Sequence, residues 1–140
     1  MRCAIVRRTV LFIAFLVLLT VGRSGDVRAG ANVWTSNGPE GGRIQALAID
    51  PATPATLYAG TDGGGVFKST DGAGSWRPAS TGLTATRIET LAIDPIAPST
   101  VYAGTEDGGV FKSTDAGSSW RAASSGLTAD RVRSLVIDPS

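Results

Sequence analysis

Histidine is absent from the 140-residue sequence, and cysteine occurs once, at Cys3. Without histidine there is no Ser-His-Asp or Cys-His catalytic arrangement, and the commonest zinc ligand is missing. A single cysteine excludes an internal disulfide framework. Aromatic residues make up only 6% of the chain, and no window keeps a helical spacing of apolar residues for about twelve positions. Histidine-based catalysis and a helical fold are therefore both excluded.

The first 31 residues have the pattern of a secretory signal peptide. Arginines precede an apolar run at residues 10–21, and residues 29–31 offer a small-x-small cleavage site. A membrane anchor is the alternative, but a spanning helix needs about 20 apolar residues and this run is shorter. We therefore predict a signal peptide over 1–31, a secreted or periplasmic protein, and no stable membrane insertion after cleavage.

Cleavage would remove five arginines and one aspartate, which turns the formal charge from +1 to mildly negative. Nucleic-acid binding calls for a basic face, so we expect no nucleic-acid partner. What remains is rich in glycine and apolar residues, as in a strand-rich globular domain.

The strongest signal is an internal repeat. Residues 44–87 and 88–131 are each 44 long and identical at 30 positions, and residues 132–139 open a third copy. A period in the forties is typical of propeller blades or helical arrays. The units contain short runs rich in β-branched and aromatic residues, bounded by Gly, Pro, Asp or Ser. Such runs favour the strands of propeller blades over helices. Four such runs fall in each unit, at residues 44–50, 56–61, 65–70 and 75–80 and at residues 88–94, 100–105, 109–114 and 119–124.

The sequence therefore predicts an all-β fold in which 44–87 and 88–131 are β-propeller blades of four antiparallel strands. Prolines after Asp50 and Asp94 end the first strands, and each aspartate is expected to bond its own turn. Glycines at residues 63–65 and 108–109 are expected to supply the positive φ of a tight link between the second and third strands.

An acidic, glycine-rich loop precedes the fourth strand of each unit, reading KSTDGAGSW at residues 68–76 and KSTDAGSSW at residues 112–120. Short Asp and Ser side chains can bond nearby backbone and hold such a hairpin closed. Gly117 permits a left-handed conformation, and the final tryptophan is expected to plug the sheet. The predicted structural residues are Ser69, Asp71, Trp76, Ser113, Asp115, Gly117 and Trp120.

The spacing Ser-x-Asp-x-Gly-x-x-Trp resembles the Asp-box, or bacterial neuraminidase repeat, of sialidases, sortilin-type receptors, xyloglucan-degrading glycosidases and the photosystem II assembly factor. Residues 113–120 match it throughout. Residues 69–76 depart from it, because Ala73 takes the glycine position between Gly72 and Gly74, so a shifted turn is expected there. The resemblance implies a propeller whose boxes are structural and lie away from any catalytic face.

A ring of six to eight such blades needs about 260–350 residues, so we expect a truncated ring. Residues 32–43, with Trp34, are predicted to form a closing strand and connector, and residues 132–140 the first strand of a third blade. Open blade faces would favour self-association of the chain.

Few residues are candidates for chemistry. No metal or cofactor is expected, because the Asp/Gly loops lack the alternating ligands and closing Glu of a calcium loop. Solvated surface is the favoured role of the acids outside the repeated turns, over a glycosidase pair. These acids are Glu89, Glu106, Asp107 and Asp130.

Arg43, Arg87 and Arg131 each precede the first strand of a unit. If that strand is innermost, their guanidinium groups would gather on the face opposite the boxes and could bind a carboxylate or sulfate by bidentate bonds. The alternative is pairing with a neighbouring acid such as Asp62 or Glu106.

Two functions stay open. One is a binding or assembly scaffold, with a protein or carbohydrate partner and no catalytic constellation in these residues. The other is a fragment of a glycoside hydrolase, sialidase-like or xyloglucanase-like, whose catalytic acids lie outside this segment. If the protein is an enzyme, glycoside hydrolysis is the activity that the resemblance implies.

Overall fold

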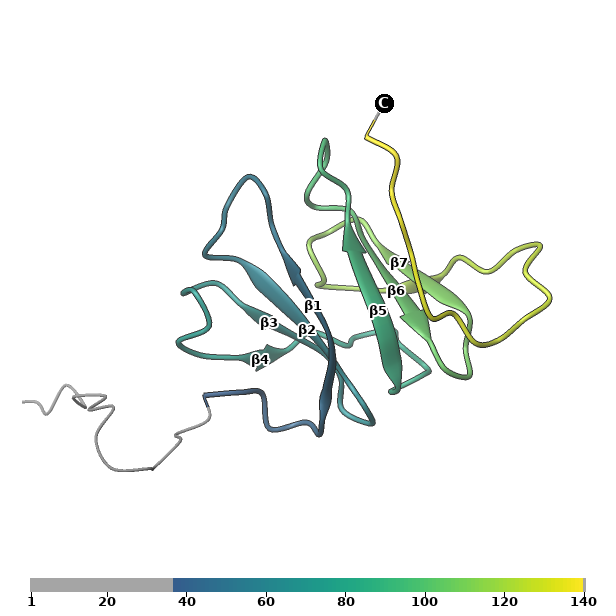
Figure 1. Cartoon of the computed structure of the whole chain (residues 1–140), viewed down its shortest axis with the longest axis horizontal. Helices are drawn as coiled ribbons and strands as arrows, with labels where there is room; N and C mark the ends of the chain where they lie inside the picture. The colour runs from purple at the N-terminus through teal and green to yellow at the C-terminus, as the bar shows by residue number, and fades with distance from the viewer. Residues whose placement is uncertain (1–36, 140) are drawn as a thin grey trace, which may run out of the picture. The chain divides into compact units, whose positions relative to one another are not determined.

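The structure, a computed structural model, describes residues 37–139, which fold into two four-stranded antiparallel sheets (Figure 1). The first sheet has the order β1 (Ile44–Ile49), β2 (Leu57–Thr61), β3 (Gly65–Ser69), β4 (Arg77–Pro78). The second has the order β5 (Ile88–Ile93), β6 (Val101–Thr105), β7 (Val110–Ser113), β8 (Arg121–Ala122). The prediction of an all-β fold with four strands per unit is confirmed; we call the two sheets blade 1 and blade 2.

The turns after β1 and β5 form as the sequence predicts. The Asp50 carboxylate accepts the backbone N–H groups of Ala52 and Thr53 at 2.8 and 3.2 Å. Asp94 accepts those of Ile96 and Ala97 at 2.9 and 3.0 Å, which lowers the pKa of its carboxyl group. Of the linking glycines, Gly63, Gly65 and Gly109 have positive φ, whereas Gly64 and Gly108 do not.

Alternation along the strands gives each blade two different faces. In blade 1 the register aligns Ala48, Tyr58, Lys68 and Arg77 on one face, which we call face A. Leu47, Ala59, Phe67 and Pro78 lie on the other, face B. In blade 2 the same register gives face A as Ala92, Tyr102, Lys112 and Arg121, and face B as Leu91, Ala103, Phe111 and Ala122.

Face B of blade 2 packs on face A of blade 1. Leu91 is buried in one core cluster with Tyr58 of blade 1, and Ile93, Ala46 and Ala48 pack against that cluster. Strands β1 and β5 contact each other closely, and Figure 1 shows them adjacent. Small side chains on one face therefore receive large apolar side chains from the next, and burial of this apolar surface holds the blades together.

The predictions for the two ends of the chain have different outcomes. Residues 132–139 are extended but form no strand, although Val132 donates its N–H to the Thr105 carbonyl at 2.8 Å. A strand exists only by pairing, and among the described residues no further strand follows this segment to form a third sheet with it. The predicted signal peptide over 1–31 and the closing strand around Trp34 lie outside the described residues. Among residues 37–139, no helix is long and apolar enough to cross a membrane.

Candidate functional site

The register places the candidate residues at opposite edges of the blades. Ile44 pairs with Thr61 and Thr61 with Gly65, so the arginines before β1 and β5 lie at the edge of the β2–β3 link. The acidic loops join the other ends of β3 and β7 to β4 and β8. We call these the arginine edge and the box edge.

At the box edge, the two acidic loops have the same hydrogen bonds. In the first, Ser69 Oγ donates to Asp71 Oδ1 at 2.8 Å, and Ser75 donates its N–H and its hydroxyl to the two carboxylate oxygens at 2.9 and 2.6 Å. Asp115 accepts from Ser113 and Ser119 at 2.7, 2.8 and 2.5 Å. Both carboxylates therefore close their own hairpins.

These bonds explain the acidity of both carboxyl groups. The Ser75 hydroxyl, then its N–H, then Ser69, lower the pKa of Asp71 from 3.8 to about 2. Ser119 and Ser113 do the same for Asp115, whose pKa is also about 2. Hydrogen bonds to a carboxylate favour its charged form, so both loops keep a full negative charge at neutral pH.

The expected shift of the first turn does not occur. Gly72 and Ala73 have φ of 69° and 70°, and their counterparts Ala116 and Gly117 have φ of 56° and 84°. Each loop thus has two consecutive left-handed residues, one glycine and one alanine, in opposite order. The carboxylate bonds fix the turn in both loops, and they outweigh the strain of one alanine.

The second loop docks on blade 1. The Ala116 carbonyl accepts a hydrogen bond from Tyr58 Oη at 3.0 Å and another from Lys68 Nζ at 2.9 Å. Burial, followed by the charges of Asp50 and Asp115, raises the pKa of Tyr58 to about 12, so its hydroxyl stays a donor. One carbonyl thus receives two donors from the neighbouring blade.

Trp120 is buried as predicted, but it does not simply plug its own sheet. Its indole Nε1–H donates to the Ala79 carbonyl of blade 1 at 2.7 Å, and its backbone N–H donates to the Thr81 carbonyl at 2.9 Å. Trp120 is 3% exposed, whereas Trp76 is only half-buried, beside residues 37–40 and Phe67. The tryptophan therefore joins a blade to the preceding one, because its indole N–H needs an acceptor that its own hairpin does not provide.

At the arginine edge, the guanidinium groups alternate with carboxylates. Arg87 reaches Asp62 of blade 1 at 3.7 Å and Glu106 of blade 2 at 2.9 Å. Glu106, followed by Asp62, raises the pKa of Arg87. Arg131 reaches Glu89 at 2.9 Å and Glu106 at 3.4 Å. Pairing with Asp62 and Glu106, the alternative for these arginines, is confirmed.

Arg43 is the least engaged of the three arginines. Within residues 37–139 its one ion pair is with Asp62 at 3.9 Å, and its side chain is 76% exposed. Binding of a carboxylate or sulfate by Arg43, Arg87 and Arg131 stays a prediction.

The acidic candidates do not form a catalytic pair in the described residues. Glu89 and Glu106 are both ion-paired with arginine, and the backbone carbonyl of Asp130 accepts a hydrogen bond from the Gly109 N–H. Asp107 lies in the β6–β7 link. No three His, Cys, Asp or Glu side chains gather as a metal site within residues 37–139.

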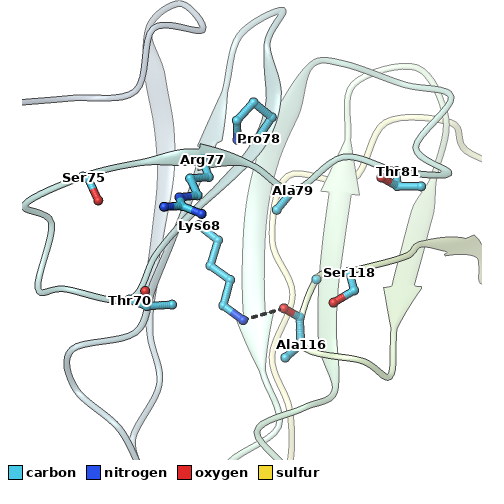
Figure 2. A pocket seen from close by; sticks show the side chains of 10 residues that line it. Lys68, Thr70, Ser75, Arg77, Pro78, Ala79, Thr81, Ala116 and Ser118 are labelled. Carbon is cyan, nitrogen blue, oxygen red and sulfur yellow. Dashed lines mark hydrogen bonds between the residues drawn. The ribbon is translucent and has the colours of Figure 1, made fainter.

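A groove at the box edge contains residues that the sequence analysis did not single out. It has a volume of about 360 Å³ and lies between face A of blade 1 and the second acidic loop. Figure 2 shows Lys68 reaching across it to the Ala116 carbonyl, with Arg77 and Thr70 on the same wall. The available signal was the repeat itself, since Tyr58, Lys68 and Arg77 recur 44 residues later as Tyr102, Lys112 and Arg121.

A comparison with protein families and with curated proteins finds no match. Among solved structures, the chain is similar to an ancestral GH74 enzyme, with a TM-score of 0.54 and 30% identity over 65% of this chain. It is also similar to the GH74 enzyme of Niastella koreensis, with a TM-score of 0.51 and 31% identity over 57% of this chain. The matched regions cover 12% and 14% of those glycoside hydrolases.

Proposed function

We propose that the two blades serve as a rigid binding or assembly scaffold of an exported protein and carry no catalytic group of their own. The observation that supports this best is the joint between the blades: Ala116 and Trp120 are each bonded to blade 1 by side-chain donors. A surface whose parts are fixed in this way binds with little loss of conformational entropy.

The state of the carboxylates supports the same proposal. Hydrolysis of a glycosidic bond calls for two carboxyl groups, one of them free to donate a proton. Glu89 and Glu106 have oxygens engaged by arginine, and Asp71 and Asp115 close their own loops. These four carboxylates are therefore engaged in ion pairs and hairpin bonds, which supports a role other than acid or base.

The test is a hydrolysis assay on the purified full chain. We expect release of reducing sugar from xyloglucan, and of fluorophore from a fluorogenic sialoside, to stay at the background level of a Glu89→Gln/Glu106→Gln double variant. Activity that this double variant abolishes would refute the scaffold proposal.

A second candidate is a blade pair of a larger glycoside hydrolase whose acids lie outside these residues, and the similarity to two GH74 enzymes favours it. Coding sequence beyond position 140 separates the two candidates. Further plain blades support the scaffold, whereas a blade with a long insertion that carries carboxylates supports the hydrolase.

A further inference from the structure

The basic side chains at the arginine edge and those on face A at the box edge differ in whether a carboxylate lies close to them. At the arginine edge Arg43, Arg87 and Arg131 each have a carboxylate within 4 Å. On face A no carboxylate lies that close to Lys68 or Arg77 of blade 1, or to Lys112 or Arg121 of blade 2, within residues 37–139. The lysines and arginines of face A therefore have no ion-pair partner in the part of the chain that the structure describes.

These cations also stand directly opposite each other. The register pairs Lys68 with Arg77 and Lys112 with Arg121 on neighbouring strands. Like charges at directly opposed positions of a sheet destabilise it. Each lysine is held over the ring of the tyrosine beside it, with Nζ 5.4 Å from the Tyr58 centroid and 5.2 Å from that of Tyr102. The same unfavourable lysine–arginine pair thus occurs in both blades, in the same geometry.

The groove of blade 1 offers donors and few acceptors. Lys68 uses one of its three N–H groups on the Ala116 carbonyl, and no residue within 37–139 accepts a hydrogen bond from the Arg77 guanidinium. The hydroxyl groups of Thr70 and Thr81 line the same groove. No carboxylate lines it, because Asp71 nearby is committed to Ser75. Such a set of donors fits a group with several negatively charged oxygens.

We infer that this groove binds a sulfate or carboxylate group of an acidic polysaccharide, with Lys68 and Arg77 as the charged contacts. The bound oxyanion neutralises two like charges that the fold otherwise holds together. This inference adds a ligand class to the proposed scaffold and rests on it.

Blade 2 repeats the arrangement, which favours a polymer over a free ion. Lys112, Arg121, Thr114 and Ser119 line an equivalent groove of about 320 Å³, whose one carboxylate, that of Asp115, is bonded to Ser119. A chain with anionic groups at intervals can occupy both grooves and gains by multivalency. No aromatic side chain lines either groove. Stacking of nucleic-acid bases thus has no platform here, and a polysaccharide is favoured.

The test compares the full chain's affinity for dextran sulfate with its affinity for uncharged dextran, by titration calorimetry at low ionic strength. We expect binding to dextran sulfate that weakens as salt is added, and none to dextran. Arg77→Gln removes an exposed cation without a partner, so the fold should persist while affinity falls about tenfold, as for loss of a charge-assisted bond. Lys68→Met should add to this loss.

The matched control is Arg133→Gln, which removes the same charge from an exposed side chain that lines neither groove and should change the affinity less than about twofold. A loss of affinity as large as that of Arg77→Gln would show that binding reflects general charge attraction, and it would overturn the groove as the binding site. The assignment of an acidic polysaccharide as the ligand would be overturned by either of two results. One is that inorganic sulfate binds as tightly as the polymer; the other is that a poly-thymidine oligonucleotide binds equally well.

The hydrolysis assay distinguishes the two proposals. Binding of dextran sulfate together with glycosidase activity would refute the scaffold and leave the groove standing. Absence of both binding and hydrolysis would refute the groove alone.

Discussion

Ala73 is the residue at which sequence and conformation disagree most. Its φ of 70° belongs to the left-handed region that glycine adopts freely and that costs an alanine about 1 kcal/mol. The Asp71 carboxylate and the Ser69 hydroxyl, which accepts the Ala73 N–H at 3.0 Å, hold the turn in place despite that cost.

Ala73→Gly should therefore raise the free energy of unfolding by about 0.5–1 kcal/mol, because it removes this strain. Ala52→Gly is the control: Ala52 is exposed and its φ is not positive, so added chain entropy should lower stability by up to about 1 kcal/mol. Urea denaturation of both variants measures the difference. A loss of stability in Ala73→Gly would contradict the strained turn.

The loop carboxylates predict how stability depends on pH. The pKa of Asp115 is about 2 in the folded chain and 3.8 ordinarily, so the unfolded chain binds its proton first as pH falls. The stabilisation is complete above pH 3.8 and is lost as the pH falls toward 2. Asp115→Asn should flatten thermal stability against pH in that window, as should Asp71→Asn. An unchanged profile in the double variant would contradict the assigned hydrogen bonds.

At the scale of the element, the two hairpins are alike in their bonds and unlike in their surroundings. Trp120 is buried between the blades, whereas Trp76 is half-buried. The contribution of a hairpin to the free energy of unfolding thus depends on the neighbour that its tryptophan contacts.

Trp120→Ala should lower the free energy of unfolding by about 3–5 kcal/mol, because it opens a cavity between the blades and leaves the Ala79 carbonyl unpaired. Trp76→Ala should cost clearly less, under about 2 kcal/mol, since Trp76 is less buried than Trp120 and removes less apolar surface from water. Chemical denaturation of the two variants gives the comparison. Equal losses would mean that the joint between blades contributes nothing.

The sequence predicts the elements well because their signals are local. Strand alternation, the Asp50 and Asp94 turns and the box spacing each involve residues a few positions apart, and the strands form close to where these signals place them. The partner of Trp120 could not be predicted, because Ala79 lies 41 positions away and contributes only a backbone carbonyl. Residues 132–139 form no strand for a related reason: pairing depends on a partner that the segment does not encode.

At the scale of the whole molecule, face B is covered by a neighbouring blade in blade 2 and is open in blade 1. Face B of blade 1 leaves Leu47 60% and Ile49 58% exposed, whereas Leu91, the counterpart of Leu47 in blade 2, is 9% exposed against blade 1. Contiguous apolar surface of this kind favours contact with other molecules.

The chain should therefore self-associate with rising concentration, and Leu47→Asp should shift sedimentation toward the monomer by placing a charge on this face. Ile96→Asp is the control, because Ile96 is 73% exposed in the β5–β6 turn and away from face B. A monomeric wild-type chain at high concentration would contradict the prediction, as would an equal effect of the two variants.

The central claim is that blade 2 is fixed to blade 1 through the indole N–H of Trp120. Its most direct test is hydrogen exchange of the indole N–H groups by NMR, with each signal assigned by a Trp→Phe variant. The account predicts that the Trp120 indole exchanges far more slowly than that of Trp76, because only Trp120 is buried and bonded to Ala79. Equally fast exchange at both positions would contradict it.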